Sequence, residues 1–101
     1  GNLGYPHDAL HYYEESLPLY QKLRRISAEA TMLNNISGVY YDLGDKHKAL
    51  AYLEQVLPID RAVGDRHGEA TTLNNIGRVY DDLGDNQKAL AYYEQALPMH
   101  R

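Results

Sequence analysis

The 101-residue sequence contains no cysteine, no tryptophan and no phenylalanine. Without cysteine it can form neither a disulfide bond nor a thiolate metal site, which fits a reducing compartment, and we expect a cytoplasmic protein. It also lacks any apolar run near the roughly 18 residues that suggest a membrane span, and its mean hydropathy is −0.59. The sequence therefore predicts a soluble chain that has no membrane partner.

Positive charge is scarce as well: the 10 lysines and arginines are outnumbered by 14 aspartates and glutamates, and the formal net charge is −4. Nucleic-acid-binding domains normally carry a basic stripe. The basic cluster of Lys22, Arg24 and Arg25 falls where we expect a loop between helices and is interpreted as a solvated loop. The 10 tyrosines are interpreted as packing residues rather than stacking platforms for bases. Nucleic acid is not an expected partner.

What the sequence does contain is an internal repeat, whose period is the constant step from Ala9 to Ala49 and from Ala49 to Ala89. The segment ALHYYEESLP that begins at Ala9 returns as ALAYLEQVLP and then as ALAYYEQALP. Between these segments, ATMLNNISGVYYDLGD from Ala30 returns as ATTLNNIGRVYDDLGD from Ala70. Internal duplication of one structural unit is the simplest explanation.

Each repeat contains two amphipathic helical patterns, which we name helix A and helix B. In both, apolar residues recur at the 3, 4, 7 spacing that places them on one helix face. Helix A is represented by Leu33, Ile36, Ser37, Tyr40 and Leu43 and by Leu73, Ile76, Gly77, Tyr80 and Leu83. Helix B is represented by Ala9, Leu10, Tyr13, Ser16 and Leu17 and by their counterparts one and two periods later. The order along the chain is therefore B-A-B-A-B.

Glycine and aspartate mark the ends of helix A and the starts of helix B. Gly44 and Gly84 suit the left-handed conformation that ends helix A. Asp45 and Asp85, directly after them, suit the N-cap of helix B. A turn this short requires helices A and B of one repeat to lie antiparallel.

The connections between repeats are predicted to differ from one another. Gly64 and Asp65 can end helix B and cap the next helix A, whereas Arg24 and Arg25 at the equivalent place cannot, so the earlier loop is less sharply defined. Proline recurs late in each helix B, and we expect a kink there, with the helix resuming to about residue 23 or 63 in the first two cases. These prolines are Pro18, Pro58 and Pro98.

The predicted domain organisation is a single array over residues 1–101. It consists of helix B of a partial repeat at 6–24, a second repeat at 27–63 and a third repeat at 66–101. The chain begins at Gly1 rather than at methionine, and we expect it to be a piece of a longer protein with further repeats.

Positions of the last repeat resemble the consensus of the tetratricopeptide repeat (TPR), and the resemblance covers essentially the whole chain. The matching residues are Leu73, Ile76, Gly77, Tyr80, Gly84, Ala89, Tyr93 and Ala96. The chain departs from the consensus in its longer period, which is about 34 residues in the family, in Ser37 and Leu53, which replace glycine and an aromatic residue, and in lacking a proline at the usual end of helix B. Units of this length with TLNN in helix A resemble the repeats of kinesin light chain and Pins-type scaffolds, and most closely the arrays of bacterial multidomain signalling proteins.

The resemblance implies an all-α fold of antiparallel helix-turn-helix units stacked as a right-handed superhelix, an α-solenoid, whose A helices line a concave groove. It also implies a non-catalytic module that binds a segment of a partner protein in that groove. By resemblance, the positions of Thr71, Asn74, Arg78 and Asp81 face the groove, and Tyr41 is the tyrosine that we interpret as a ligand contact. The candidate peptide-binding residues are Thr31, Asn34, Asn35, Tyr41, Thr71, Asn74, Asn75, Arg78 and Asp81.

Asparagine suits peptide binding because its amide carries both a donor and an acceptor for backbone groups. Neighbouring A helices are expected about 10 Å apart, the length of about three residues of extended chain, so Asn34 and Asn74 could bind one peptide in register. Alternatively, Asn35 and Asn75 bond between helices and order the stack. Arg78 either pairs with an acidic ligand residue or is neutralised by the aspartates beside it. The carboxylate clamp of some TPR domains is incomplete, because neither helix A contains a lysine.

No arrangement of residues indicates catalysis, a cofactor or a metal site. Asp81 and Asp82 are adjacent in sequence, so on a helix they point about 100° apart and cannot act on one substrate. His7 and His11 have a spacing that can chelate a metal ion, but no third ligand is evident and the HExxH pattern is absent. We therefore predict no enzyme, no cofactor and no metal.

A structural role is the second function that the sequence allows. Helix B at each end lacks the neighbour that would cover its apolar face in a longer array. Such ends are able to stack on a second copy, which would make the chain a self-associating spacer. The expected partners are a protein or peptide ligand and, in this alternative, a second copy in a homo-oligomer.

Overall fold

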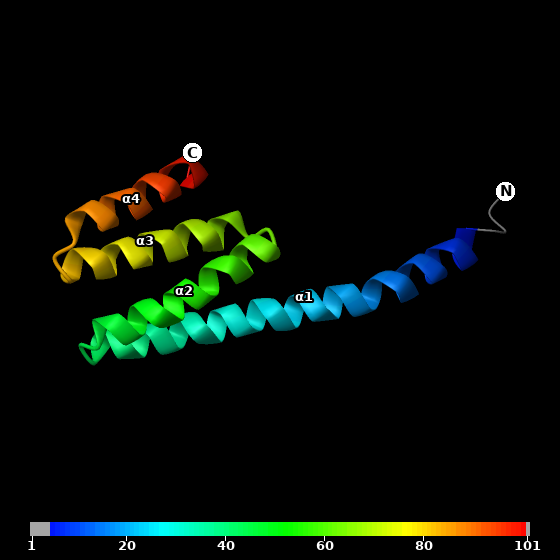
Figure 1. Ribbon diagram of the computed structural model, residues 1–101. Helices are drawn as coiled ribbons and strands as arrows, with labels where there is room; N and C mark the ends of the chain where they lie inside the picture. Colours follow the sequence, from blue (N-terminus) through cyan, green and yellow to red (C-terminus); the bar gives the residue numbers. More distant parts are fainter. Residues whose placement is uncertain (1–4, 101) are drawn as a thin grey trace.

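The computed structural model describes the backbone of residues 5–100 and the side chains of residues 15–19 and 21–98. Over these residues the chain is helical and contains no strand, which confirms the predicted all-α class (Figure 1). The helices are α1 (Tyr5–Asp42), α2 (Lys46–Ala62), α3 (Arg66–Asp82) and α4 (Asn86–Ala96), followed by a 3-10 turn, η1 (Leu97–His100).

Consecutive helices pack side by side as antiparallel pairs. Contacts join α1 to α2, α2 to α3 and α3 to α4, so the stack grows in chain order (Figure 1). The C-terminal half of α1 and all of α3 are the two A helices, while α2 and α4 are B helices. The N-terminal half of α1 extends away from the stack, which gives the molecule its longest dimension of 66 Å.

The chain reverses at Gly44, where the backbone has a φ of 86°. The N–H of Gly44 bonds to the carbonyl of Tyr41 at 3.0 Å, and the N–H of Asp45 bonds to the carbonyl of Tyr40 at 2.9 Å. This pair of bonds is a Schellman motif, which satisfies the last carbonyls of a helix. The Asp45 side chain then accepts a hydrogen bond from the N–H of Lys48 and caps α2.

The other two reversals are built in the same way, which confirms the helix ends predicted from glycine and aspartate. Gly64 and Gly84 have φ values of 72° and 85°. Asp65 and Asp85 are the N-caps of α3 and α4, each accepting from the backbone N–H three residues later. These turns hold each helix antiparallel to the next.

The loop expected between residues 24 and 27 does not form, and this prediction was wrong. Helix α1 continues through Lys22, Arg24 and Arg25, so this basic cluster lies exposed on a helix rather than in a loop. Arg24 and Arg25 occupy the place of Gly64 and Asp65, and arginine is a good helix former that neither favours positive φ nor caps a helix. We call residues 5–23 of α1 the arm and residues 27–42 the A segment.

The prolines behave in two ways. Pro18 lies inside α1 and Pro58 inside α2, and both helices continue beyond them as expected. Helix α4 instead ends at Ala96, ahead of Pro98, and the chain continues as the 3-10 turn η1. The missing N–H of proline is thus tolerated inside two helices and coincides with the end of the third.

The two repeats place equivalent residues in equivalent surroundings. The rings of Tyr40 and Tyr52 stack with centroids 5.6 Å apart, and those of Tyr80 and Tyr92 stack at 5.6 Å as well. Buried apolar side chains fill the space between α2 and α3 and between α3 and α4. They include Leu50, Leu53, Ala70, Leu73, Ile76, Val79 and Ala96. The sequence duplication is therefore also a structural duplication.

The two departures from the TPR consensus compensate for each other. A Cβ atom on Gly77 would lie 2.6 Å from the ring of Tyr93, so only glycine fits there. In the preceding repeat, Leu53 replaces the aromatic ring and Ser37 replaces the glycine. The buried Ser37 hydroxyl donates to the carbonyl of Ala49 at 2.9 Å, which satisfies it inside the core. A smaller partner on helix B thus leaves room for a larger residue on helix A.

Replacing Gly77 by alanine is expected to lower the free energy of unfolding by about 1–3 kcal/mol, because the added methyl group overlaps the Tyr93 ring. Urea unfolding followed by circular dichroism measures this. In a Tyr93→Leu background the loss should largely disappear, as leucine accompanies serine in the other repeat.

Gly38 supplies the matched control. It is exposed, and nothing lies within 4 Å of a Cβ added there. Gly38→Ala is therefore expected to raise the free energy of unfolding by about 0.5–1 kcal/mol through helix propensity alone. Equal effects of Gly77→Ala with and without the Tyr93 ring would contradict the steric explanation.

Candidate functional site

A small pocket lies between the two A helices. It has a volume of about 60 Å³ and takes its walls from the A segment of α1, from α3 and from Leu53 of α2. Its lining residues are Asn34, Ser37, Gly38, Tyr41, Leu53, Asn75, Arg78 and Val79. Four of the nine candidate residues, Asn34, Tyr41, Asn75 and Arg78, are therefore brought to one place.

A second pocket continues along α1 toward its N-terminal end. It has a volume of about 130 Å³, and Asn34 lines both pockets. Thr31 lines this second pocket together with Asp60 and Asp65. Two small pockets thus lie one after the other along the A segment, with Asn34 lining both, and we call them together the depression.

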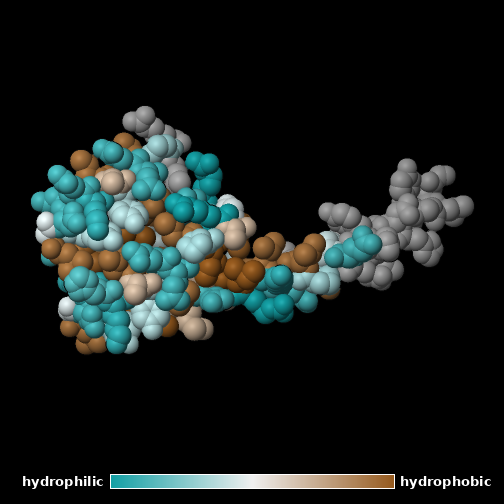
Figure 2. Space-filling model, in the orientation of Figure 1, coloured by the Kyte–Doolittle hydropathy of each residue, from teal (hydrophilic) through white to brown (hydrophobic). Residues whose placement is uncertain are grey.

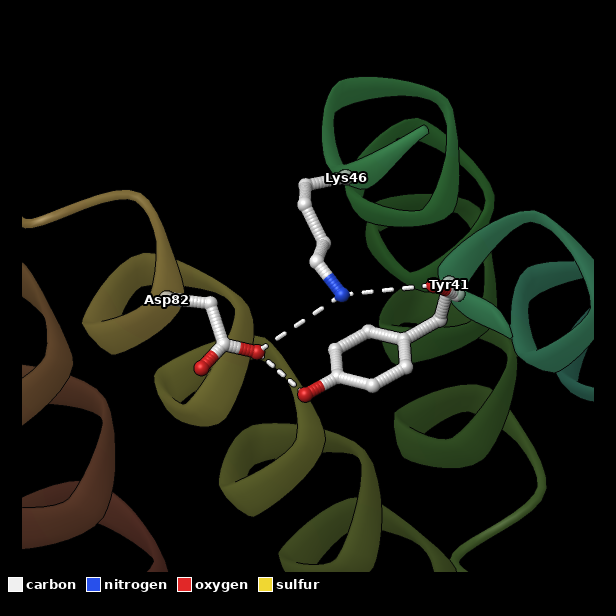
Figure 3. A network of polar contacts seen from close by, with 3 residues as sticks. All are labelled: Tyr41, Lys46 and Asp82. Carbon is white, nitrogen blue, oxygen red and sulfur yellow. Dashed lines mark hydrogen bonds and ion pairs between the residues drawn. The ribbon is translucent and has the colours of Figure 1, made fainter. Parts of the chain in front are cut away.

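Tyr41 joins three helices at one end of this depression (Figure 3). Its hydroxyl donates to the Asp82 carboxylate on α3. Lys46 of α2 donates to the Tyr41 carbonyl at 3.2 Å, lies 4.0 Å from the Asp82 carboxylate and sits 3.5 Å from the centroid of the Tyr41 ring. The hydrogen bond to Asp82, with burial as the next cause, raises the pKa of Tyr41. The hydroxyl that we predicted to contact a ligand is thus engaged between the A helices.

Arg78 lies at the same end of the depression. Its guanidinium carbon is 4.8 Å from the centroid of the Tyr41 ring, and its side chain is exposed. Its neighbour on α3, Asp81, accepts a hydrogen bond from the Tyr93 hydroxyl at 3.2 Å. Burial, and then this hydrogen bond, raise the pKa of Tyr93, whereas the positive charge of Arg78 opposes the increase. Arg78 therefore interacts with both tyrosines that bond to the aspartates of α3.

The remaining candidates are spread over the surface of the A helices. Thr31 is exposed, and its hydroxyl donates to the carbonyl of Ser27 in its own helix at 3.2 Å. Asn35 and Thr71 are exposed, and Asn74 is half-buried. Of the two adjacent asparagines on α3, Asn75 lines the pocket with Asn34, and Asn74 does not. We expected Asn74 to bind a peptide in register with Asn34. At this pocket Asn34 is accompanied by Asn75 instead.

Sequence reasoning missed a buried polar pair beneath the second pocket. Asp60 of α2 is only 5% exposed, and the Thr72 hydroxyl of α3 donates to its carboxylate at 2.8 Å. Burial raises the pKa of Asp60, the Thr72 hydrogen bond acts against this, and the negative charges of Asp65 and Glu69 add to it. The sequence did contain a signal for this pair. Neither Asp60 nor Thr72 recurs one period earlier, where Tyr20 and Met32 occupy the equivalent positions.

Metal-binding groups and membrane spans are both absent from the described residues. Within them, no group of three or more His, Cys, Asp or Glu side chains is placed to hold a metal ion. His7 and His11 lie in α1, but their side chains are outside the described residues, so the expectation that they hold no metal stays a prediction. None of the helices, over the part of the chain that the structure describes, has the length and apolar character needed to cross a bilayer.

Comparison with known proteins agrees with this architecture. The family model described as Tetratricopeptide repeat matches residues 3–62 and, overlapping with these, residues 28–101. The first match ends at the end of α2, and the second begins at the start of the A segment. No curated protein matches the chain.

The buried carboxyl of Asp60 is expected to make stability depend on pH. Because its pKa is raised on folding, the folded chain holds this proton more tightly than the unfolded chain. Stability should therefore fall as the pH rises from the ordinary aspartate pKa of about 3.9 to the raised value, and stay lower above it. Asp60→Asn, which keeps an acceptor for Thr72, should remove this contribution and raise stability at pH 7.

Urea unfolding between acidic and neutral pH, compared between the wild type and Asp60→Asn, measures this difference. Asp42→Asn, on the exposed end of α1, serves as the control for loss of one carboxylate. Parallel pH profiles for the wild type and Asp60→Asn would show that Asp60 titrates alike in the folded and unfolded chains.

Proposed function

The chain belongs to the tetratricopeptide repeat family, whose members are in general protein–protein interaction modules, and from this premise we propose that it binds an extended peptide segment of a partner protein. The peptide would lie across the two A helices, over the depression that Asn34 borders. The observation that carries the proposal is the pocket where Asn34 and Asn75 meet from neighbouring repeats.

Two amides that line one pocket from different helices suit the backbone of an extended chain. Each carboxamide offers a donor and an acceptor, so it can bond to the N–H and C=O groups of one residue whatever its side chain is. Asn34 and Asn75 are both half-buried, which limits competition from water without closing them off. A pocket of about 60 Å³ holds at most a small side chain. Backbone contacts would therefore supply much of the affinity.

Charge at the end of the depression is mixed. Arg78 is exposed beside the pocket and is able to pair with an acidic residue of the ligand. Asp81 and Asp82 follow on the same helix, and Lys46 approaches Asp82 from α2. This balance favours a ligand of low net charge with one acidic group near Arg78. The proposal includes a cytoplasmic setting, no catalytic step and no cofactor.

The alternative is a structural spacer that associates end to end. Leu90 is exposed on α4, the last helix B, and Leu97 is exposed at the start of η1, directly after it. Met32 and Val39 are exposed on the A segment, the first helix A. In a head-to-tail stack α4 of one copy would cover the A segment of the next, and the contact would repeat without closing. Light scattering would then show a mass that keeps growing with concentration.

Peptides selected from a random display library on the wild-type chain provide the test of the groove. Their affinity, measured by fluorescence anisotropy, is expected to fall at least about tenfold in the Asn34→Ala, Asn75→Ala double variant, the effect of about 1.4 kcal/mol of lost hydrogen bonding. Measuring an Asn34→Ala, Asn74→Ala variant beside it shows which of the two adjacent asparagines of α3 contributes to peptide affinity.

The matched control removes two amides from the B helices. Gln55 and Gln95 lie at equivalent positions of the two repeats and are exposed, and each side chain donates to a carbonyl of its own helix. Gln55→Ala, Gln95→Ala should leave peptide affinity unchanged. Equal losses in the two double variants, or no loss in either, would refute binding through the asparagines.

A further inference from the structure

The arm of α1 is a helix B without the packing that helix B has elsewhere in the chain. Leu17, at the position of Leu57, is 53% exposed, whereas Leu57 is partly buried against neighbouring helices. Leu19 and Leu23 are exposed on the same arm. Figure 2 shows hydrophobic side chains on the narrow part of the molecule that leads from the stack into the arm. The arm therefore exposes apolar side chains among its residues 15–19 and 21–23, whose side chains the structure describes.

The A segment lacks the cover that the second helix A has. Thr72 and Val79 of α3 are 0% and 1% exposed, because α2 lies over them through Asp60, Leu50 and Leu53. The equivalent residues of the A segment, Met32 and Val39, are 62% and 57% exposed. What is missing above Met32 and Val39 is thus a helix B that precedes them in the repeat order.

The sequence contains that helix B, but the geometry of α1 holds it out of reach. The arm has the helix B sequence, and it would cover the A segment if the chain reversed between them as it does at Gly64. Helix α1 runs straight through this point instead, so the arm points away from its own A segment (Figure 1). Each chain carries both halves of one interface and cannot join them internally.

We propose that two copies of the chain exchange arms, the arm of each copy covering the Met32 and Val39 face of the other copy's A segment. The packing would repeat the contact that α2 already makes with α3 inside each chain. In that contact Leu57 packs against the cluster that contains Leu73. The exchanged arm therefore places Leu17 of one copy at Leu33 of the other.

This register is compatible with a closed, symmetric dimer. Residue 25 lies midway between Leu17 and Leu33, and it also lies close to the middle of α1, which spans Tyr5–Asp42. Two antiparallel α1 helices crossing near residue 25 can cover both A segments at the same time. Such a contact uses one surface twice and leaves no end open for a third copy.

Helix α4 is the competing cover, and it fits less well. It exposes Leu90, and Leu97 is exposed directly after it, but α4 is only 11 residues long and its use would leave both arms uncovered. Arm exchange covers the arm and the A segment in a single contact. Met32 and Val39 are not lining residues of the depression, so the exchange leaves the proposed peptide groove open.

Cysteine cross-linking tests the exchange directly, because the chain has no cysteine of its own. In Leu17→Cys, Leu33→Cys the two sulfurs of one straight α1 are separated by about 24 Å of helix, too far for a disulfide. Mild oxidation is expected to give a covalent dimer on a non-reducing gel, and sedimentation of the wild type to give twice the chain mass of 11.5 kDa at saturation. Leu17→Cys alone and Leu33→Cys alone each lack one of the two cysteines, so neither should form this cross-link.

A variant that restores the turn provides the second part of the test. Arg24→Gly, Arg25→Asp installs the pair that reverses the chain at Gly64 and Asp65, so the arm should fold back on its own A segment. The chain should then be monomeric, and the two cysteines should form a disulfide within one chain. Arg24→Ala, Arg25→Ala, which keeps the helix, should remain dimeric.

Two results would overturn the proposal. A monomeric wild type, together with an intrachain disulfide in the Leu17→Cys, Leu33→Cys variant, would mean that the arm folds back without help. A mass that rises without reaching a limit would mean that α4 stacks on the A segment in an open array. Either result leaves the peptide-binding test with the asparagine variants unaffected, because that test does not depend on the oligomeric state.

Discussion

Reversal of the backbone at each glycine–aspartate pair is the constraint on which the rest of the structure depends. The glycine takes a positive φ that other residues adopt only at a cost, and the aspartate caps the following helix. Where the pair is present, at Gly44, Gly64 and Gly84, helices lie antiparallel and bury their apolar faces. Where two arginines replace it, the helix continues and those faces stay exposed. One local choice of residues thus decides which surfaces the chain buries by itself.

The candidate site is a consequence of these reversals. Two consecutive turns carry the chain from the A segment through α2 and back along α3, so equivalent surfaces of two A helices come to lie beside each other. Asn34 and Asn75 line one pocket at that junction, and Tyr41 bonds across it to Asp82. The pocket between the A helices is therefore a property of the stack, since residues of both A helices line it. The bond from Tyr41 to Asp82 also links the two A helices directly.

Much of the fold could be read from the repeat, because its signals are local. The glycine turns, the aspartate caps and the apolar stripes each depend on residues within one or two helical turns, and the period is their recurrence along the chain. The continuous α1 was missed although Arg24 and Arg25 already lacked turn chemistry, because the repeat pattern implied a break that these residues do not make. At the site, the choice between Asn74 and Asn75 depends on how α3 is rotated against the A segment, which spacing along one helix does not specify.

The sequence by itself determined the helical class, the order of A and B helices and the three reversals, because backbone conformation at glycine, at a cap and along an amphipathic stripe is set by neighbouring residues. Only the tertiary structure decided that Asp60 is buried against Thr72, that Leu53 makes room for Ser37, and that the arm lies apart from the A segment that its sequence fits. These outcomes depend on which side chains meet across helices, and contacts between residues distant in sequence leave no periodic trace along the chain.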